Sequence, residues 1–397
     1  MKNMPWRKCS VMDERMRFVI RLKDGESMAS LCREFNISRK TGYKILERYE
    51  QCGVEGLSDR ARRPFRYANQ LPEQIEAAIV AARREKPTWG ARKIRERLLR
   101  RLPHAIKVPA CSTIHAVLDR HGLVSHPIRS RTRAQGTRLS DGVKPNDLWC
   151  TDYKGEFQLG DKRYCYPLTV TDHASRYLLL CEALESNREH SAFMAFERLF
   201  KERGLPQAIR SDNGVPFASP NGLFNLSKLS VWWLRLGITI ERIRPGHPQQ
   251  NGRQERMHLT LKQEATRPAG QNILQQQAKF DAFIEDFNLQ RPHEALAMKC
   301  PAEVYTASTR LYHGIAEPHY PFHDRSVVVT HCGRLCLYNK KINLSSSLAG
   351  QAVGVKEVDD GIWLVSFMQY DLGYVDLEEK TLQPAANPFG PKVLPMS

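Results

Sequence analysis

The stretch LWCTDY, residues 148–153, decides the fold of the larger part of this chain. Its apolar and β-prone side chains predict a strand that is buried on both faces. Asp152 is the one carboxylate in that run, and burying an ion costs free energy unless the ion is paired or binds a metal. We therefore expect Asp152 to serve the chemistry of the protein from a central strand.

Two further acidic residues stand in similar surroundings. Asp212 ends a short predicted strand within AIRSDNG, residues 208–214. Glu255 lies one turn into a predicted helix that follows the loop 247–252, which contains Pro and Gly. If these side chains converge with Asp152, their oxygens form a site suited to Mg²⁺ or Mn²⁺. On a basic chain, such a site points to phosphoryl transfer on nucleic acid.

The excess positive charge lies in the N-terminal third of the chain. The 397 residues include 60 Lys and Arg against 43 Asp and Glu, a formal net charge of +17. Residues 1–140 hold 31 of the basic and 14 of the acidic residues, so the remainder is neutral. This block predicts a surface that binds a polyanion. An inert basic surface is the alternative.

Several classes of protein are disfavoured by the composition. No apolar run approaches the roughly 20 residues of a membrane span, and the basic N-terminus lacks the apolar segment of a signal peptide. The ten cysteines are scattered without a C-x₂-C pair, which argues against a zinc ribbon or a redox motif. We expect a reducing, cytoplasmic setting.

Residues 11–50 predict a helix-turn-helix. A first helix is expected over 12–23 and a second over 28–35. A tight turn at 36–38 leads to a third helix from residue 39, with Ser38 as its N-cap. A small bundle without a ligand is the alternative, but the basic first turns favour DNA recognition. The expected contacts are Arg39, Lys40, Tyr43 and Lys44.

Basic and helical segments follow this first domain, which we place at 1–55. The linker 56–70 is rich in Arg and Pro and is expected to track phosphates, with a plain tether as the alternative. Residues 71–125 contain three predicted helices and form a second helix-turn-helix, winged or plain. A second basic linker covers 126–145. The expected DNA contacts in these segments are Arg60, Arg62, Arg63, Arg66, Arg92, Lys93, Arg129, Arg131 and Arg133.

From residue 146 the pattern changes to strands and helices in alternation. Turn signals separate three strand-like segments, at 148–157, 163–171 and 176–183. Then come a helix over 189–203, a short strand that ends at Asp212, a helix over 222–236 and a strand over 238–243. Helices near 251–266 and 272–289 complete the unit. This order predicts a mixed α/β core over 146–305.

The last part of the chain changes to short strands with tight turns. Segments 350–358 and 362–367 flank Asp-Asp-Gly, a strong hairpin signal, and 327–330 and 334–338 flank another turn. We expect a small β-barrel over 306–380 and a flexible tail over 381–397. The fold class is thus multidomain α and α/β.

Four motifs in order carry a resemblance to a known family. They are WCTDY at 149–153, SDNG at 211–214, HPQQNG at 247–252 with Glu255 and Arg256, and QRPHEAL at 290–296. Together they resemble the signature of DDE transposases with a retroviral-integrase core, above all bacterial insertion-sequence transposases with two N-terminal helix-turn-helix units. The best-known relatives leave thirty-five residues between the second acid and the glutamate. Here 42 intervene, and we place the extra length within 217–233.

The resemblance implies an RNase H-like catalytic core in which Asp152, Asp212 and Glu255 hold two Mg²⁺, with Mn²⁺ able to substitute. It implies a DNA transposase that binds the terminal inverted repeats of an insertion sequence, frees a 3′-OH and joins it to target DNA. No Tyr or Ser has the context of a nucleophile, so no covalent protein–DNA intermediate is expected. The implied partners are double-stranded DNA and at least one further copy of the chain, and the implied location is the bacterial nucleoid.

Other residues near the motifs are open to two interpretations. Asn251 lies one helical turn before Glu255 and Lys262 two turns after it, so they share its face. We expect Asn251 or Gln249 to line the site and Lys262 to contact donor DNA, with a solvated helix face as the alternative. Arg291 and His293 contact DNA or lock the end of a helix. Asp172 is expected to be a hairpin residue.

Two rival functions share these features. One is a DNA-binding regulator whose core has lost its chemistry, and activity with Mg²⁺ against EDTA separates it from an enzyme. The other is a structure-selective nuclease on the same fold, which cuts DNA without joining 3′ ends. A polymerase or ligase is disfavoured because no G-x-x-x-x-G-K-[ST] loop occurs.

Overall fold

The structure is a computed structural model that describes residues 10–59, 71–124, 139–244 and 246–390. It divides into two compact units, Met1–Glu73 and Gln74–Ser397. No helix in the described ranges is both long and apolar enough to cross a membrane. Seven of the expected DNA contacts lie outside the described residues: Arg60, Arg62, Arg63, Arg66, Arg129, Arg131 and Arg133.

The first unit contains the expected helix-turn-helix. Its helices are α1 (Val11–Lys23), α2 (Met28–Glu34) and α3 (Arg39–Cys52), and a 3₁₀ turn covers Gly53–Leu57. Serines at positions 10, 27 and 38 cap the three helices through their side chains. Gly42 allows α3 to pack closely, because a Cβ there would lie 2.7 Å from both Cys32 Sγ and Met28 Sδ.

The second unit begins with three more helices, α4 (Glu73–Glu85), α5 (Ala91–Arg101) and α6 (Cys111–Arg120). Their shared core is apolar and includes Ile79, Ile94, Leu98 and Ile114, all at most 4% exposed. No strand is found within the described residues 71–124, so this group resembles a plain helix-turn-helix and has no wing there.

A mixed sheet forms the centre of the second unit. Its strands are β1 (Leu148–Tyr153), β2 (Phe157–Gln158), β3 (Tyr164–Asp172), β4 (Leu178–Leu184), β5 (Ala208–Ser211) and β6 (Thr239–Arg242). The order is β4-β3-β1-β5-β6, and β2 pairs with the start of β3. Strands β1, β3 and β4 are antiparallel, whereas β5 and β6 run parallel to β1. This is the mixed, RNase H-like sheet that we expected.

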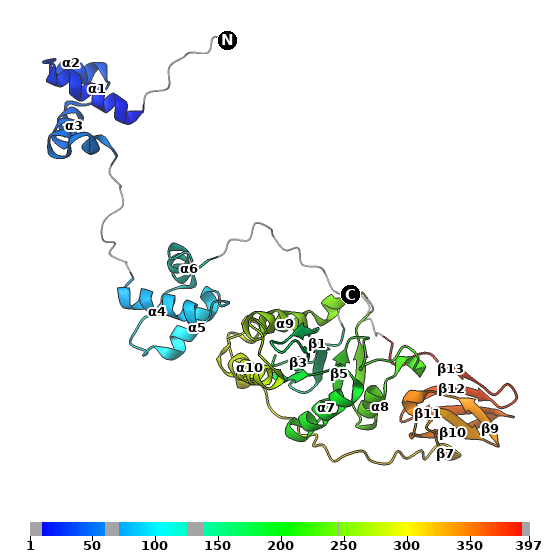
Figure 1. Cartoon of the computed structure of the whole chain (residues 1–397). Helices are drawn as coiled ribbons and strands as arrows, with labels where there is room; N and C mark the ends of the chain where they lie inside the picture. Colours follow the sequence, from blue (N-terminus) through cyan, green and yellow to red (C-terminus); the bar gives the residue numbers. More distant parts are fainter. Residues whose placement is uncertain (1–9, 60–70, 125–138, 245, 391–397) are drawn as a thin grey trace, which may run out of the picture. The chain divides into compact units, whose positions relative to one another are not determined.

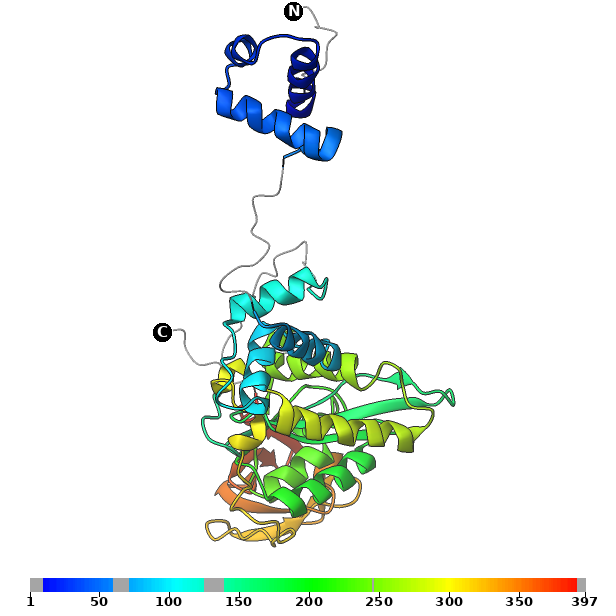
Figure 2. The same ribbon diagram turned by 90° about the vertical axis from the view of Figure 1, so that its left-hand side faces the viewer.

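Helices cover both faces of the sheet. On one face, α7 (Glu189–Arg203) and α8 (Lys228–Arg235) pack on Trp149 and Ile209. The other face is covered by α9 (Gly252–Glu264) and α10 (Ile273–Glu285), as Figures 1 and 2 show. These two helices share a smaller core with Leu178 and Cys181. Because side chains alternate along a strand, residues 150 and 152 of β1 point to the face opposite Trp149, which is the face that α9 covers.

The helix expected over 222–236 is shorter than the prediction. Phe224 and Asn225 adopt φ values of 53° and 57°, and α8 begins only after Ser227 caps it. Left-handed backbone cannot continue an α-helix, so residues 213–227 form an irregular loop. This loop overlaps the segment 217–233, where we placed the additional length between Asp212 and Glu255, and that placement stays a prediction.

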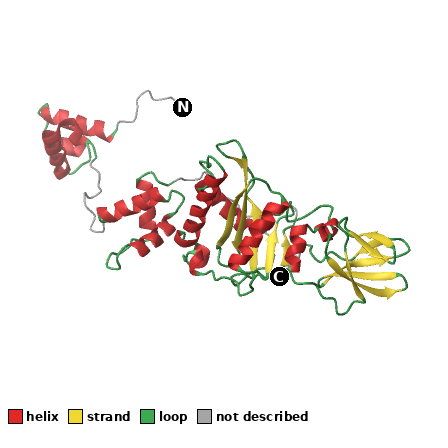
Figure 3. Cartoon of the chain, turned by 60° about the horizontal axis from the view of Figure 1, so that its bottom comes forward, coloured by secondary structure: helices red, strands yellow, loops and turns green. Residues whose placement is uncertain are grey.

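The C-terminal part is a second β structure (Figure 3). Its main sheet has the order β13-β12-β11-β10-β7, with β7 (Arg325–Val328), β10 (Ala352–Asp359), β11 (Ile362–Phe367), β12 (Tyr370–Asp376) and β13 (Thr381–Pro384). The expected hairpin is present as β10–β11. Strands β8 (Arg334–Leu337) and β9 (Lys340–Asn343) form a separate pair. No pairing closes the main sheet among the described strands, so the predicted barrel is not confirmed.

The tail expected over 381–397 is folded in its first part. Strand β13 pairs with β12, and Phe389 is 4% exposed with its ring centroid 4.6 Å from that of Tyr370. The prediction from Pro content missed this aromatic contact. Residues 391–397 lie outside the described ranges.

Candidate active site

Asp152 and Asp212 come from neighbouring parallel strands. The pairing Cys150 with Arg210, two residues earlier on each strand, puts Asp152 level with Asp212, which directly follows β5. Adjacent strands lie about 5 Å apart. Both side chains point to the face that α9 covers, because side chains two residues apart share a face. The two acids that the sequence separates by sixty positions therefore meet at one edge.

Two polar residues of α9 that the sequence analysis missed fix this helix beside Asp152. Gln254, fully buried, donates to Thr169 Oγ1 at 2.7 Å and accepts from Thr171 Oγ1 at 2.5 Å. Thr169 Oγ1 lies 2.7 Å from His258 Nε2 and donates to the backbone oxygen of Asp152 at 3.0 Å. Glu255 stands between these two anchors on α9. In the sequence, Gln254 lies one position before Glu255 and His258 three positions after it. This spacing was the pattern from which their role beside Glu255 could have been predicted.

The imidazole of His258 presents a lone pair to Asp152. Burial lowers the pKa of His258 to about 3, so the ring is neutral. The single hydroxyl proton of Thr169 goes to the Asp152 carbonyl, so His258 Nε2 carries the proton of the ring. Nδ1 is then unprotonated and lies 3.8 Å from Asp152 Oδ2. This arrangement favours a proton or a cation at Asp152.

The two aspartates have raised pKa values. Burial first, then the charges of Asp212 and Glu255, raise the pKa of Asp152 to about 7. Burial also raises the pKa of Asp212, against a hydrogen bond from the Gly214 amide. Asp212 Oδ1 is buried without a hydrogen-bond partner among the described residues. A divalent cation would stabilise both carboxylates in their charged form and would give Asp212 Oδ1 a partner. The oxygens of Asp152 and Asp212 therefore fit a metal ion.

Glu255 completes this set less fully than expected. It is exposed on α9, and its charge reaches Asp152. Within the described ranges, however, no group of three or more His, Cys, Asp or Glu side chains is close enough to hold a metal. The structure thus brings Asp152 and Asp212 together and leaves Glu255 outside a closed ligand cluster. A glutamate side chain has three rotatable bonds, so its carboxylate position is decided by rotamer choice.

Two lysines lie near Asp152, and an asparagine stands at the N-cap position of the helix that carries Glu255. Burial, then the charge of Lys262, lowers the pKa of Lys154, whose charge also interacts with Asp152. Lys262 is exposed, so both cations lie near the acids with Lys262 open to solvent. Asn251 is 4% exposed, and neither atom of its amide has a hydrogen-bond partner in the described part of the chain. The side chain of Gln249 is not described.

Two other acidic residues of the core, Asp172 and Glu241, have structural roles. Asp172 ends β3 and accepts hydrogen bonds from Ser175 Oγ at 2.5 Å and from the Asn146 amide at 2.7 Å, so it is a turn residue. Glu241 pairs with Arg210 at 2.9 Å. Trp232 and Trp233 belong to the core that α7 also contributes to.

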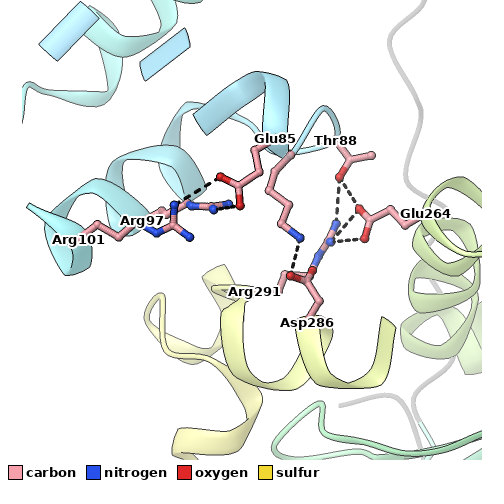
Figure 4. Close-up of polar contacts among 8 residues, drawn as sticks. Glu85, Thr88, Arg97, Arg101, Glu264, Asp286 and Arg291 are labelled. Carbon is pink, nitrogen blue, oxygen red and sulfur yellow. Dashed lines mark hydrogen bonds and ion pairs between the residues drawn. The ribbon is translucent and has the colours of Figure 1, made fainter. Parts of the chain in front are cut away.

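Arg291 and His293 lie close to the helical group α4–α6. Arg291 is 5% exposed and donates to both oxygens of Glu264 at 2.9 and 3.0 Å. Thr88 contacts Glu264 at 2.5 Å, and Lys86 pairs with Asp286 at 2.5 Å, as Figure 4 shows. His293 is partly buried with its ring 5.1 Å from that of Phe287. Arg291 therefore joins α9 to the loop after α4.

The expected DNA contacts of the helical units differ in their accessibility. Arg39, Lys40, Tyr43 and Lys44 are all exposed on α3. Arg92 pairs with Glu294 at 2.7 Å, and Lys93 is half-buried beside Arg256 and Arg291. The α3 residues are thus free to meet a ligand, whereas Arg92 has an acidic partner within the chain.

Comparison with known proteins assigns domains to these parts. A profile of the integrase core domain matches residues 142–248, and a second one of that description matches 236–301. A helix-turn-helix domain profile matches 14–65, and a homeodomain-like domain profile matches 41–118. The matches cover the mixed sheet, the acids and the N-terminal helices.

Relatives with similar sequences come from insertion elements. The chain is 26% identical over 263 residues to the insertion element IS407 uncharacterized 31.7 kDa protein of Burkholderia multivorans, covering 64% of this chain and 88% of that protein. It is 25% identical over 287 residues to the insertion element IS476 uncharacterized 39.2 kDa protein of Xanthomonas euvesicatoria, covering 70% and 78%.

Among solved structures, the catalytic core domain of HTLV-2 integrase in complex with magnesium is similar. It has a TM-score of 0.33 and 15% identity, over 42% of this chain and 99% of that one. The simian T-cell lymphotropic virus intasome has a TM-score of 0.37 and 14% identity, over 74% and 97%.

Proposed function

Because the chain belongs to the bacterial insertion-sequence transposases with an integrase-type core, we propose that it cuts and joins the ends of a mobile DNA element. The observation that carries this proposal is the meeting of Asp152 and Asp212 on adjacent parallel strands, with Glu255 on the helix that covers them. The helix-turn-helix units are the proposed binding sites for the terminal inverted repeats.

The proposed cofactor is Mg²⁺, as two ions held by Asp152, Asp212 and Glu255, with Mn²⁺ as a substitute. When bound, divalent ions activate a water or 3′-OH and stabilise the charge of an in-line displacement at phosphorus. Support for this ligand set comes from the unpartnered Asp212 Oδ1 and the raised pKa of Asp152. Binding of the ions requires Glu255 to turn its carboxylate toward the two aspartates.

The residues of the chain itself have separate tasks in this proposal. Gln254 and His258 hold α9 on β3, which keeps the Glu255 backbone beside Asp152. Lys262 and Lys154 lie where they would neutralise phosphates of the donor end next to the reacting bond. Asn251, buried and unpartnered among the described residues at the start of α9, is the proposed polar contact to that end. Two ends must be joined together, so the active form is at least a dimer.

The reaction itself tests the proposal. Oligonucleotides with the borders of the element are incubated with a target plasmid, in Mg²⁺ or in EDTA. Joined products that appear only with Mg²⁺ or Mn²⁺ are expected. Cutting without joining would favour the structure-selective nuclease, and specific binding without either reaction would favour the regulator.

The recognition helix gives a prediction about binding. We expect Lys40→Ala with Lys44→Ala to make the slope d log K/d log[salt] less negative by about 2, since each lysine neutralises about one phosphate. Both side chains are exposed on α3, so the fold is retained. The measurement is fluorescence anisotropy with the end duplex from 50 to 200 mM salt. Glu47→Gln on the same helix is the control, and an unchanged slope in the lysine variant would remove α3 from the interface.

Asp152 gives a prediction about pH and metal. Its pKa is about 7 in the fold against an ordinary 3.8, so between these values the folded chain holds a proton that the unfolded chain has lost. The stability from this proton is present at low pH and is lost as the pH rises through 7. We expect the Tm in EDTA to fall from pH 5.5 to 8, and Mg²⁺ to restore most of it at pH 8.

Asp152→Asn is the matched variant for this prediction, because it keeps the shape and removes the titration. Its Tm is expected to change less between pH 5.5 and 8, and Mg²⁺ is expected to raise it less than in the wild type. Identical pH profiles for the two proteins would show that Asp152 does not titrate in this range.

A further inference from the structure

A basic cavity lies outside the site formed by the three acids. A cavity of about 1320 Å³ is bounded by the first turns of α5, α6 and α9, and none of Asp152, Asp212 and Glu255 lines it. Its walls include two acidic side chains, Asp172 and Glu294, and six cationic ones: Arg92, Lys93, Arg176, Arg253, Arg256 and Arg291. The cavity therefore carries a strong excess of positive charge.

Most of these cations have no carboxylate partner in the described part of the chain. Arg291 pairs with Glu264 and Arg92 with Glu294. Arg176 and Arg253 both donate to one backbone oxygen, that of His173, at 3.1 and 3.0 Å. For Lys93 and Arg256, no ion pair or side-chain hydrogen bond is present within the described ranges. Asp172 is already engaged by Ser175 and Asn146.

The crowding is large enough to affect protonation. Burial, then the charges of Arg291 and Arg256, lowers the pKa of Lys93 to about 8. Burial and the charge of Arg253 lower the pKa of Arg176 to about 10. Like charges held together in a partly desolvated site destabilise the free protein. An anion in the cavity would reverse this penalty.

Backbone dipoles add to the positive field. The first residues of α5 (Gly90 and Ala91), of α6 (Cys111 and Ser112) and of α9 (Gly252 and Arg253) all line the cavity. None of the three helices has a side-chain cap at its N-terminus among the described residues. Free amide groups at a helix N-terminus bind phosphate readily.

A buried histidine on the cavity wall also lacks a partner. His173 is 5% exposed, and its Nε2 has no hydrogen-bond partner in the described ranges, with the nearest acid oxygen there, Asp141 Oδ1, 3.9 Å away. Burial, then the charges of three neighbouring arginines, lowers its pKa to about 3, so the ring is neutral and offers Nε2 as a donor or an acceptor.

We propose that this cavity binds backbone phosphates of the element-end DNA between the second helical group and α9. The proposal rests on the proposed function, because it names the DNA that the transposase holds. The cavity is much larger than one inorganic phosphate and joins α5 and α6 to α9, which suits an extended polyanion. DNA seated here would connect the helices at 73–120 to the helix that carries Glu255.

The test measures binding without catalysis, in EDTA. We expect Lys93→Gln with Arg256→Gln to weaken binding of the full chain to the end duplex more than tenfold at 150 mM salt. The slope of log K against log[salt] is expected to become less negative by about 2. Lys93→Arg with Arg256→Lys keeps the charges and is expected to retain wild-type binding. Lys228→Gln, an exposed cation outside the cavity lining, is the matched control.

Two further readouts separate the possible outcomes. Removing crowded cations is expected to leave the Tm of the free protein unchanged or higher, so weak binding would not reflect unfolding. Cys111 lines the cavity, and its alkylation is expected to slow when duplex DNA binds the wild type but not the double Gln variant. Equal affinity, slope and Cys111 protection in wild type and double Gln variant would overturn the cavity proposal. Absence of specific end binding by the wild type would instead overturn the proposed function.

Discussion

Alanine at Asp152 is expected to reduce strand transfer by at least about a thousandfold, a loss of ~4 kcal/mol of transition-state stabilisation. The reason is its position near Asp212, which directly follows β5, and Glu255 on α9, because the charges of both raise the pKa of Asp152. Without this carboxylate, we expect the proposed site to lose its divalent ions, because fewer anionic ligands then compete with the water that hydrates the ions. The measurement is the rate of joining of pre-cut end oligonucleotides to plasmid DNA under saturating protein.

Binding and folding serve as the controls for this result. Asp152→Ala is expected to bind the end duplex as the wild type does and to unfold at an equal or higher temperature, because a buried charge has been removed. Asp172→Asn is the matched variant at another buried acid, because Asp172 belongs to a turn and is not one of the three acids of the candidate site. This variant is expected to lower the stability of the protein more than its rate of joining. Undiminished joining by Asp152→Ala would remove this residue from the reaction.

Arg291→Ala is expected to cost about 3 kcal/mol of unfolding free energy, because truncation leaves a half-buried charge without its partner. Arg291 is 5% exposed and makes two hydrogen bonds to Glu264 (Figure 4). Its guanidinium also lies 5.9 Å from the centroid of the Trp89 ring. The measurement is urea unfolding of the full chain. Because Thr88 also contacts Glu264, the variant is expected to loosen the packing of the α4–α5 loop on α9.

A double-mutant cycle with Glu264→Ala separates the pair from its surroundings, with an expected coupling of about 1–3 kcal/mol. Arg198→Ala is the matched control, because its ion pair with Glu182 lies on the surface of the core. An exposed pair contributes about 0–1 kcal/mol. Equal costs for Arg291→Ala and Arg198→Ala would show that Arg291 does not join α9 to the helical group.

Local signals in the sequence were sufficient for much of the fold. Ser10, Ser27 and Ser38 cap the three helices of the first unit, and the apolar period set their buried faces. Helix α7 ends at Arg203, directly before Gly204, as predicted. These elements depend on interactions within one turn of the chain, which is why local patterns predict them.

Non-local contacts account for the errors. The helix expected from residue 222 was interrupted by left-handed residues at 224 and 225, whose backbone oxygens accept hydrogen bonds from the Arg242 side chain. The tail was expected to be loose because it is rich in proline, but Phe389 packs between Tyr370 and Phe224. Neither contact leaves a local pattern, because the partners lie far apart in the sequence.

By itself, the sequence predicted phosphoryl transfer and the choice of the three acids, since a carboxylate in an apolar strand is costly unless it pairs or binds a metal. Only the tertiary structure decided which of them meet. The parallel register of β1 and β5 brings Asp152 level with Asp212, and the bonds of Gln254 and His258 to β3 fix the helix of Glu255. The basic cavity also required the fold, because its cations come from α5, the turn after β3, α9 and the segment after α10. Proximity between distant segments depends on packing free energy summed over the whole core, which no short stretch of residues encodes.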